Sequence, residues 1–255
     1  MTPELHPDFL RIPLAHRALH DVSDGRPENS RSAVRAAIKA GYGIEIDIQR
    51  SADDCAMVFH DYTLERLAKA EGVIRDRTAA DLAKIELRGS QEGVPTLPDV
   101  LALVQGQVPV LIEIKDQDGS MGPSIGPLEK SVAEAISTYK GPVAVMSFNP
   151  HSVAEMARRA PSVARGIVTS AYEVSDESLP EDVRARLREI PDYERTRSCF
   201  ISHDRADLPR ARVLALKEQG ARILCWTIKS PKEEAVAREI AENITFEQYL
   251  APFPA

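Results

Sequence analysis

The stretch Gly43-Ile44-Glu45-Ile46-Asp47-Ile48 has the pattern of a buried β-strand, with an isoleucine at every second position. Side chains at positions i and i+2 of a strand point to the same face, so Glu45 and Asp47 are expected to lie on one side. Two neighbouring carboxylates among apolar side chains repel each other and lose hydration, which is costly unless a cation or a proton compensates them. A hard divalent cation such as Mg²⁺ or Ca²⁺, which prefers oxygen ligands, is the simplest compensation. The strand therefore predicts a metal site.

Similar apolar runs alternate with segments of helical period on both sides of this strand. The expected strands are 12–15, 44–48, 57–60, 110–115, 143–148, 164–169, 199–202, 223–227 and 243–246. The expected helices are 29–40, 79–86, 97–104, 128–139, 150–159, 180–189, 208–219 and 231–241. Glu28 or Asn29 is expected to begin the first helix. This alternation predicts parallel strands, most simply an α/β TIM (β/α)8 barrel, and we expect residues 1–255 to form a single domain.

One connection departs from the alternation. Only eight residues separate Ile48 from Met57, too few for a crossover helix. Residues 57–60 are therefore expected to pair antiparallel with the second strand as a hairpin excursion, which leaves 243–246 to close the barrel. The Gly- and Ser-containing segment 116–126 follows a strand directly and is expected to be a loop on the catalytic face.

The overall composition narrows the classes of partner. The chain has 255 residues, 43% of them hydrophobic, and a net charge of -7, which gives no electrostatic reason to expect nucleic acid. Cys55, Cys199 and Cys225 lie in separate apolar runs and are expected to be buried thiols in a reducing compartment. The pattern of a secretory signal and a run long enough to span a bilayer are both missing, so we expect a cytoplasmic protein without membrane insertion. The oligomeric state is not indicated.

Ionisable side chains occur on or just after four successive strands. They are His16, Arg17, Glu45, Asp47, His60, Asp61, Glu113 and Lys115. In α/β barrels the functional residues gather at the C-terminal ends of the strands, so this set predicts an active site. Taken singly, a histidine at a strand end is more often a structural residue, and Glu113 beside Lys115 could be a structural ion pair. Trp226, the only tryptophan, is equally compatible with core packing and with lining a pocket.

A series of short motifs runs through the chain from His16 to Thr227. They are Ala15-His16-Arg17, Pro27–Ser30, Gly41–Asp47, Val58–Asp61, Thr63–Arg66, Pro95–Leu97, Glu113–Lys115, Ser147-Phe148 and Trp226-Thr227. In this order they resemble the glycerophosphodiester phosphodiesterase family, and the similarity covers nearly the whole chain. Each motif alone is weak, whereas the ordered set is highly specific.

The resemblance implies a TIM barrel that hydrolyses glycerophosphodiesters to sn-glycerol 3-phosphate and an alcohol, in glycerol and lipid metabolism. It implies roles for ten residues: Glu45, Asp47 and Glu113 as ligands of a divalent metal, His16 and His60 as general acid and base, Arg17, Lys115 and Glu28 at the substrate, and Phe148 and Trp226 lining the pocket. Asn29 would support the site. Which histidine is the acid, whether the metal is Mg²⁺ or Ca²⁺, which alcohol is released, and whether water or the glycerol hydroxyl attacks first stay open.

The sequence departs from the family pattern in three places. Ala18 replaces the glycine of the usual His-Arg-Gly motif, the stretch 19–26 is longer than common, and residues 241–247 replace a familiar Gly-x-Asp-Gly-Ile-x-Thr-Asp. Ala18 is expected to alter the shape of its loop, because glycine reaches backbone angles that alanine resists. The five metal and histidine positions are intact, so the departures bear on substrate choice more than on activity.

Three other functions are compatible with parts of this pattern. A related phospholipase would act on lysophospholipids or sphingomyelin-type lipids, although 5% aromatic residues and the lack of a basic amphipathic stretch argue mildly against work at a membrane surface. A catalytically inactive barrel could bind phosphodiesters, but no ligand or histidine position is lost. A hydrolase of the amidohydrolase type would need a His-x-His pair, and His16-Arg17-Ala18 does not supply one.

Overall fold

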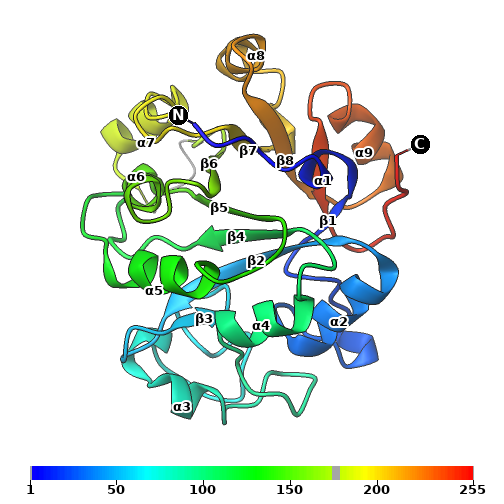
Figure 1. The fold of residues 1–255 in the computed structure, drawn as a ribbon, viewed down its shortest axis with the longest axis vertical. Coiled ribbons are helices and arrows are strands. Elements are labelled where there is room, and N and C mark those ends of the chain that lie inside the picture. Colours follow the sequence, from blue (N-terminus) through cyan, green and yellow to red (C-terminus); the bar gives the residue numbers. More distant parts are fainter. Residues whose placement is uncertain (1, 174–178, 255) are drawn as a thin grey trace. The chain divides into compact units, whose positions relative to one another are not determined.

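Strands and helices alternate along the chain as a TIM (β/α)8 barrel, in agreement with the prediction (Figure 1). The computed structural model describes residues 2–173 and 179–254. Two compact units make up the chain. Unit 1 comprises Met1–Pro13, Asp116–Ile125 and Ala144–Ala255, and unit 2 comprises Leu14–Lys115 and Gly126–Val143.

The strands of unit 2 contain the stretch that predicted the fold. They are β1 (Leu14–Ala15), β2 (Gly43–Arg50), β3 (Ala56–Val58) and β4 (Val110–Ile114). Strand β2 pairs in parallel with both β1 and β4, and β3 pairs with it antiparallel, with Ile48 opposite Val58. The predicted hairpin excursion is therefore confirmed. In the register between β2 and β4, Asp47 lies opposite Glu113, which brings two of the predicted metal ligands to adjacent strands.

Helices α2 (Arg31–Ala40), α4 (Leu97–Val104) and α5 (Pro127–Ile136) pack within unit 2, and α2 and α4 lie next to each other (Figure 1). Helix α2 begins later than predicted. Its N-cap is Ser30, whose hydroxyl accepts the backbone N–H of Ala33, so neither Glu28 nor Asn29 caps it. The predicted end is confirmed, because Gly41 adopts the left-handed conformation (φ 79°) that stops the helix.

The segment between β3 and α4 has its own small apolar cluster. Its buried members are Met57, Phe59, Leu64, Leu67, Ala68, Ile74, Leu82, Leu87 and Val94. The helix predicted over 79–86 is wrong beyond its first turn, because α3 spans only Ala79–Leu82. The backbone then pairs with other segments, in the bridges Ala68↔Leu87 and Glu86↔Gly93. These pairings satisfy polar groups that a longer helix would have used internally.

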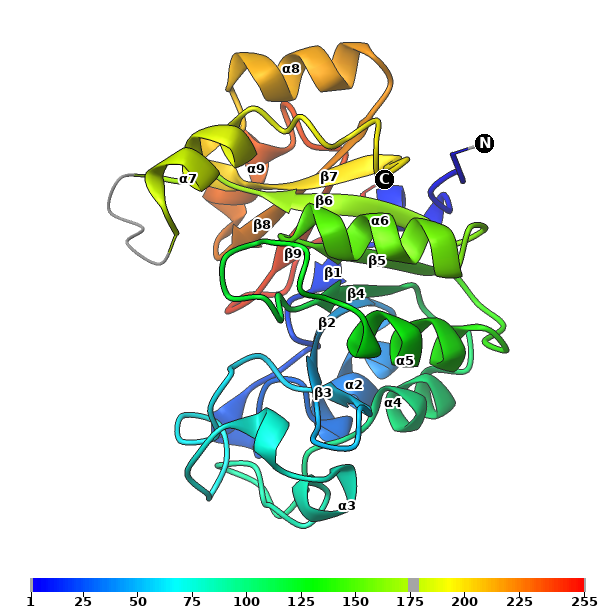
Figure 2. The ribbon, with the colours of Figure 1, turned by 90° about the vertical axis from the view of Figure 1, so that its left-hand side faces the viewer.

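In unit 1, five strands pair in sequence order and all in parallel (Figure 2). They are β5 (Val143–Ser147), β6 (Ala164–Thr169), β7 (Phe200–Asp204), β8 (Arg222–Ile228) and β9 (Asn243–Phe246). The helices of this unit are α1 (Asp8–Arg11), α6 (Pro150–Arg159), α7 (Glu181–Arg188), α8 (Ala211–Glu218) and α9 (Pro231–Ala237). The short helix α1 was not predicted. Strand β7 begins one residue and ends two residues later than predicted.

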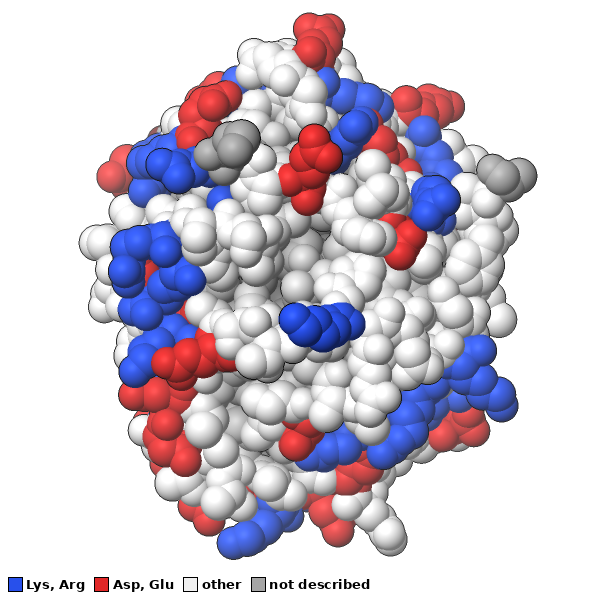
Figure 3. All heavy atoms as spheres, viewed as in Figure 1, with Lys and Arg blue, Asp and Glu red and all other residues white. Residues whose placement is uncertain are grey.

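The predictions drawn from the composition concern the cysteines, the surface charge and membrane-spanning helices. The three cysteines are free, with Cys225 buried and Cys55 and Cys199 partly buried, so the expectation of buried thiols is confirmed fully only for Cys225. On the face drawn in Figure 3, acidic and basic side chains of the described residues lie next to one another. Within the described ranges, no helix combines the length and apolar character needed to cross a bilayer.

Candidate active site

The three predicted metal ligands converge within unit 2. Glu45 and Asp47 come from β2 and Glu113 from β4, and one carboxylate oxygen of each lies within 4.8 Å of the other two. All three side chains are buried: Glu45 and Asp47 are 1% exposed and Glu113 is 7% exposed. The i, i+2 spacing on β2, which the strand pattern predicted, and the parallel register with β4 together produce this arrangement. Three hard oxygen donors around one point fit a divalent cation.

The nearby cations compensate these carboxylates unequally. The Lys115 Nζ lies 2.7 Å from Asp47 Oδ1 and 2.6 Å from Glu113 Oε1. Burial alone would raise the pKa of Asp47, but the charges of Lys115, His60 and Arg17 lower it below its ordinary value. The pKa of Glu45, by contrast, lies well above its ordinary value, because burial and the charges of Asp47 and Glu113 disfavour its carboxylate. Burial also raises the pKa of Glu113, so an added cation would stabilise the charged forms of both glutamates.

Asn29 fixes the orientation of Asp47. Its Nδ2 donates to Asp47 Oδ2 at 2.8 Å, and its Oδ1 accepts the backbone N–H of Asp47 at 3.2 Å. The Asn29 backbone has a φ of 59°, in the left-handed region that asparagine tolerates better than most residues. The supporting role expected for Asn29 thus has a direct structural basis.

His60 is held by the residue that follows it. Its Nδ1 lies 2.6 Å from Oδ1 of Asp61. Although burial raises the pKa of Asp61, hydrogen bonds from Arg66 and His60 lower it below its ordinary value, so the carboxylate is charged and Nδ1 is the donor. This leaves Nε2 as the nitrogen that can exchange a proton with a substrate. Burial and the charge of Lys115 lower the pKa of His60, which favours the neutral ring.

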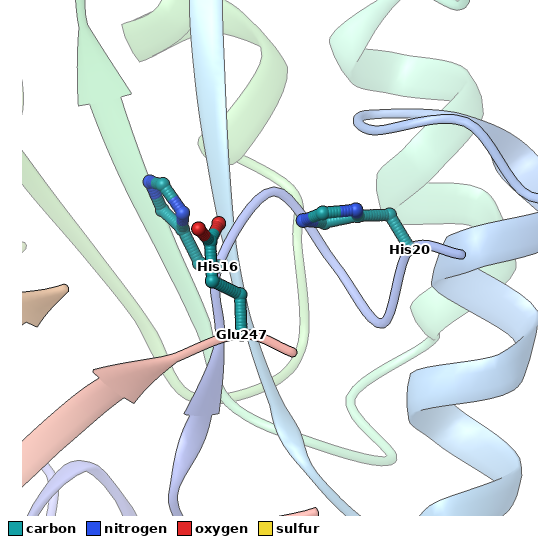
Figure 4. Close-up of side chains that lie close together, drawn as sticks. All are labelled: His16, His20 and Glu247. Carbon is teal, nitrogen blue, oxygen red and sulfur yellow. The ribbon is translucent and has the colours of Figure 1, made fainter. Parts of the chain in front are cut away.

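His16, the second predicted acid or base, follows β1 and is partly buried. A ring nitrogen of His16 lies within 4.8 Å of one in His20, four residues later in the same loop (Figure 4). His20 could not be singled out from the sequence, because it lies in a polar stretch with no periodicity. The proximity of the two rings depends on the turn of the intervening backbone.

That turn contains the unusual Ala18. Arg17 and Ala18 have φ values of 52° and 63°, so the alanine adopts the left-handed conformation that a glycine would take. The expectation that Ala18 alters the shape of the loop stays a prediction. Backbone N–H groups attach the turn to β2, from Arg17 to Glu45 Oε2 and from Ala18 to the Glu45 carbonyl, each at 2.9 Å. These bonds hold the backbone in the strained conformation.

The substitution Ala18→Gly is expected to raise the free energy of unfolding by about 0.5–1 kcal/mol. A left-handed alanine costs roughly 1–2 kcal/mol, and the extra freedom of glycine in the unfolded chain offsets part of the gain. Urea denaturation followed by circular dichroism measures the change. Ala102→Gly is the matched control, because Ala102 is an exposed residue inside α4 where the same change should cost about 1 kcal/mol. Destabilisation by both variants would contradict the assigned strain.

The predicted substrate contacts divide between the two units. In unit 2, Arg17 lies beside the cluster, with its Nε 3.6 Å from Asp47 Oδ2, and its Nη1 donates to Glu28 Oε1 at 2.7 Å. In unit 1, the rings of Phe148 and Trp226 contact each other edge-on with centroids 5.6 Å apart. Trp226 Nε1 also donates to the carbonyl of Ser202. Their place in a pocket stays a prediction.

A TIM barrel in which buried carboxylates converge beside two cationic side chains and an aspartate-bound histidine has the composition of a phosphoric ester hydrolase. The chain belongs to the Glycerophosphoryl diester phosphodiesterase family, whose sequence profile residues 16–244 match. The recognition made from the motifs is thereby confirmed, and with it the assignment to the enzymes of this family.

Individual relatives agree with this assignment. YhdW of Bacillus subtilis is 26% identical over 232 residues, which cover 87% of this chain and 88% of YhdW. The glycerophosphodiester phosphodiesterase of Caldanaerobacter subterraneus is 30% identical over 165 residues, which cover 61% of this chain and 65% of that protein, slightly less than two thirds of its length. Among solved structures, a phosphodiesterase of Oleispira antarctica in complex with the product sn-glycerol-3-phosphate superposes with a TM-score of 0.77 at 22% identity, over 94% of both chains.

Proposed function

We propose that this protein hydrolyses glycerophosphodiesters to sn-glycerol 3-phosphate and an alcohol, in a reaction that requires Mg²⁺ or Ca²⁺. The convergence of Glu45, Asp47 and Glu113 within 4.8 Å carries this proposal. The sn-glycerol-3-phosphate bound to the Oleispira antarctica phosphodiesterase supports the choice of product. A small-molecule substrate fits the mixed surface charge, and free thiols are compatible with a cytoplasmic location.

The three carboxylates would hold the cation. When bound, the ion would supply positive charge that polarises a phosphoryl oxygen. Arg17 and Lys115 stand beside the cluster and would contact the phosphate, where their charges oppose the repulsion that protects a phosphodiester from nucleophiles. Their ion pairs with Asp47 and Glu28 restrict both side chains before the substrate arrives.

His16 and His60 would move the protons of the reaction. One ring takes the proton of the attacking hydroxyl and the other protonates the departing oxygen. Because Asp61 accepts from Nδ1, His60 would act through Nε2, and the lowered pKa of His60 keeps its ring neutral and able to accept a proton. Phe148 and Trp226 would line the substrate pocket, as the family resemblance implies.

Protein stripped with EDTA is expected to release no sn-glycerol 3-phosphate from glycerophosphocholine, and to recover activity when Mg²⁺ or Ca²⁺ is returned. A coupled assay with glycerol 3-phosphate dehydrogenase measures the release, and phosphorus NMR reports any cyclic phosphate formed first. Glycerophosphoethanolamine and lysophosphatidylcholine in the same assay separate the proposed activity from the phospholipase alternative. Full activity in EDTA would contradict the metal requirement, and ion binding without turnover of any substrate would favour an inactive barrel.

A further inference from the structure

Arg66, which lies outside the barrel repeat, connects two residues of the candidate active site. Its guanidinium binds Asp61 in a bidentate manner, with Nε and Nη2 each 2.6 Å from a carboxylate oxygen. The same group reaches Glu28, with Nη1 3.0 Å from Oε2 and Nη2 3.1 Å from Oε1. One planar side chain therefore joins two carboxylates that are 33 residues apart in the sequence.

Each of those carboxylates in turn holds a side chain of the site. Asp61 accepts from His60 at 2.6 Å, and Glu28 accepts from Arg17 at 2.7 Å. The result is a continuous chain of charged hydrogen bonds from the histidine to the arginine, with Arg66 at its centre. Removal of Arg66 would leave both carboxylates without a common anchor.

The backbone around Arg66 is itself fixed. Leu64 and Ala68 are fully buried and Leu67 is 8% exposed, all in the apolar cluster that precedes α4. The Arg66 side chain is 50% exposed, whereas Asp61 and Glu28 are 20% and 13% exposed. The guanidinium thus shields the Asp61 and Glu28 carboxylates from solvent. The apolar cluster between β3 and α4 holds the backbone of Arg66 in place. A lysine could not make the same contacts, because its ammonium lacks the planar fork.

We propose that Arg66 is a positioning residue that orients His60 through Asp61 and Arg17 through Glu28, and that the segment between β3 and α4 supplies it to the site. The proposal rests on the proposed function for its kinetic consequence. Misplacement of reacting groups by about 1 Å can lower a rate by roughly 10²-fold. The effect of Arg66 should therefore appear mainly in kcat, with an increase in KM from the loosened Arg17.

The test uses Arg66→Gln and Arg66→Lys in the full chain. Arg66→Gln is expected to lower kcat/KM by about 10–100-fold with an unchanged circular dichroism spectrum, and Arg66→Lys is expected to recover less than half of the loss on a logarithmic scale. Arg88→Gln is the matched control, because Arg88 lies in the same segment between β3 and α4 and its Nε donates to the carbonyl of Glu65. It should retain the wild-type kcat and KM.

A double-mutant cycle separates positioning from a direct contact with the substrate. In the Asp61→Ala, Glu28→Ala background, adding Arg66→Gln should change kcat/KM by less than about twofold, because the partners through which Arg66 acts are gone. An undiminished effect in that background would overturn the proposal. So would an Arg66→Gln enzyme with wild-type kinetics, or an equal loss in Arg88→Gln.

One readout does not depend on turnover. Long-range ¹H–¹⁵N NMR of the histidine rings reports the tautomer of His60, which should be protonated on Nδ1 in the wild type and a mixture in Arg66→Gln. If the wild type hydrolyses no phosphodiester, the proposed function fails while this measurement still tests the link. An unchanged His60 tautomer in Arg66→Gln would overturn the positioning role.

Discussion

Replacing Glu45 by glutamine is expected to lower glycerophosphodiester hydrolysis by about 10³-fold or more, and to leave the metal-free fold at least as stable as the wild type. The loss of activity follows from the loss of one of the three proposed metal ligands, since about 4 kcal/mol of transition-state stabilisation corresponds to roughly 10³-fold in rate. The stability follows from the raised pKa of Glu45. A carboxylate whose pKa rises on folding opposes folding at neutral pH, so its neutral isostere removes that cost.

Asp47→Asn is the informative comparison, because the sign of its stability effect is opposite. The pKa of Asp47 is lowered on folding, so its charge contributes stability that is present at neutral pH and lost on acidification through the folded pKa. Asparagine would break a buried ion pair with Lys115, at a cost of roughly 3–5 kcal/mol. Both variants should lose activity, but only Asp47→Asn should unfold at lower temperature in EDTA.

Thermal unfolding in EDTA and the coupled glycerol 3-phosphate assay measure these two effects separately. Glu86→Gln provides a control, because Glu86 forms a surface pair with Lys69 and should change stability by no more than about 0.5 kcal/mol. Destabilisation of similar size by Glu45→Gln and Asp47→Asn would show that the two carboxylates are compensated alike, contrary to the electrostatics of the cluster.

His16→Ala and His60→Ala are each expected to lower kcat by about 10²–10⁴-fold without loss of fold, since each ring would move one proton of the reaction. The two variants should respond differently to the leaving group. Loss of the general acid matters little when the departing alcohol is as acidic as p-nitrophenol, whereas loss of the general base affects every substrate. One variant should therefore recover most of its rate on a p-nitrophenyl glycerophosphodiester and the other should not.

This comparison assigns the acid and the base, which the sequence left open. His6→Ala is the control, because His6 is exposed, its Nδ1 accepts the backbone N–H of Asp8, and its loss should not affect kcat. If both histidine variants kept more than about a tenth of the wild-type rate on glycerophosphocholine, proton transfer by these residues would be excluded as a main contribution.

The carboxylate cluster could be predicted from the sequence because it depends on regular geometry. The period of two places Glu45 and Asp47 on one face, and parallel pairing places Glu113 on the neighbouring strand. The motifs that resemble the family extended this to His16 and His60. The convergence of the three carboxylates thus required no knowledge of irregular backbone, whereas the roles of His16 and His60 stay predictions.

The features that could not be predicted from the sequence lie in or next to segments without regular secondary structure. Arg66 forms hydrogen bonds with Glu28, which is 38 residues away in the sequence. Arg66 lies in the segment between β3 and α4, which has no repeating pattern. The left-handed backbone at Ala18 contradicts the preference of alanine, and only the bonds to Glu45 explain it. Helix α3 is shorter than its composition indicates, because pairing of residues 86–93 competes with the helix. Local propensity does not contain these long-range contacts.

The position of Lys115 bears on whether the protein must bind a metal ion in order to fold. With its ammonium between Asp47 and Glu113, the chain brings its own positive charge into the carboxylate cluster as it folds. Folding is therefore not conditional on a metal, unlike that of small domains whose core is a bound zinc ion. We therefore expect that a single preparation can be treated with EDTA and reloaded with different cations in turn without unfolding.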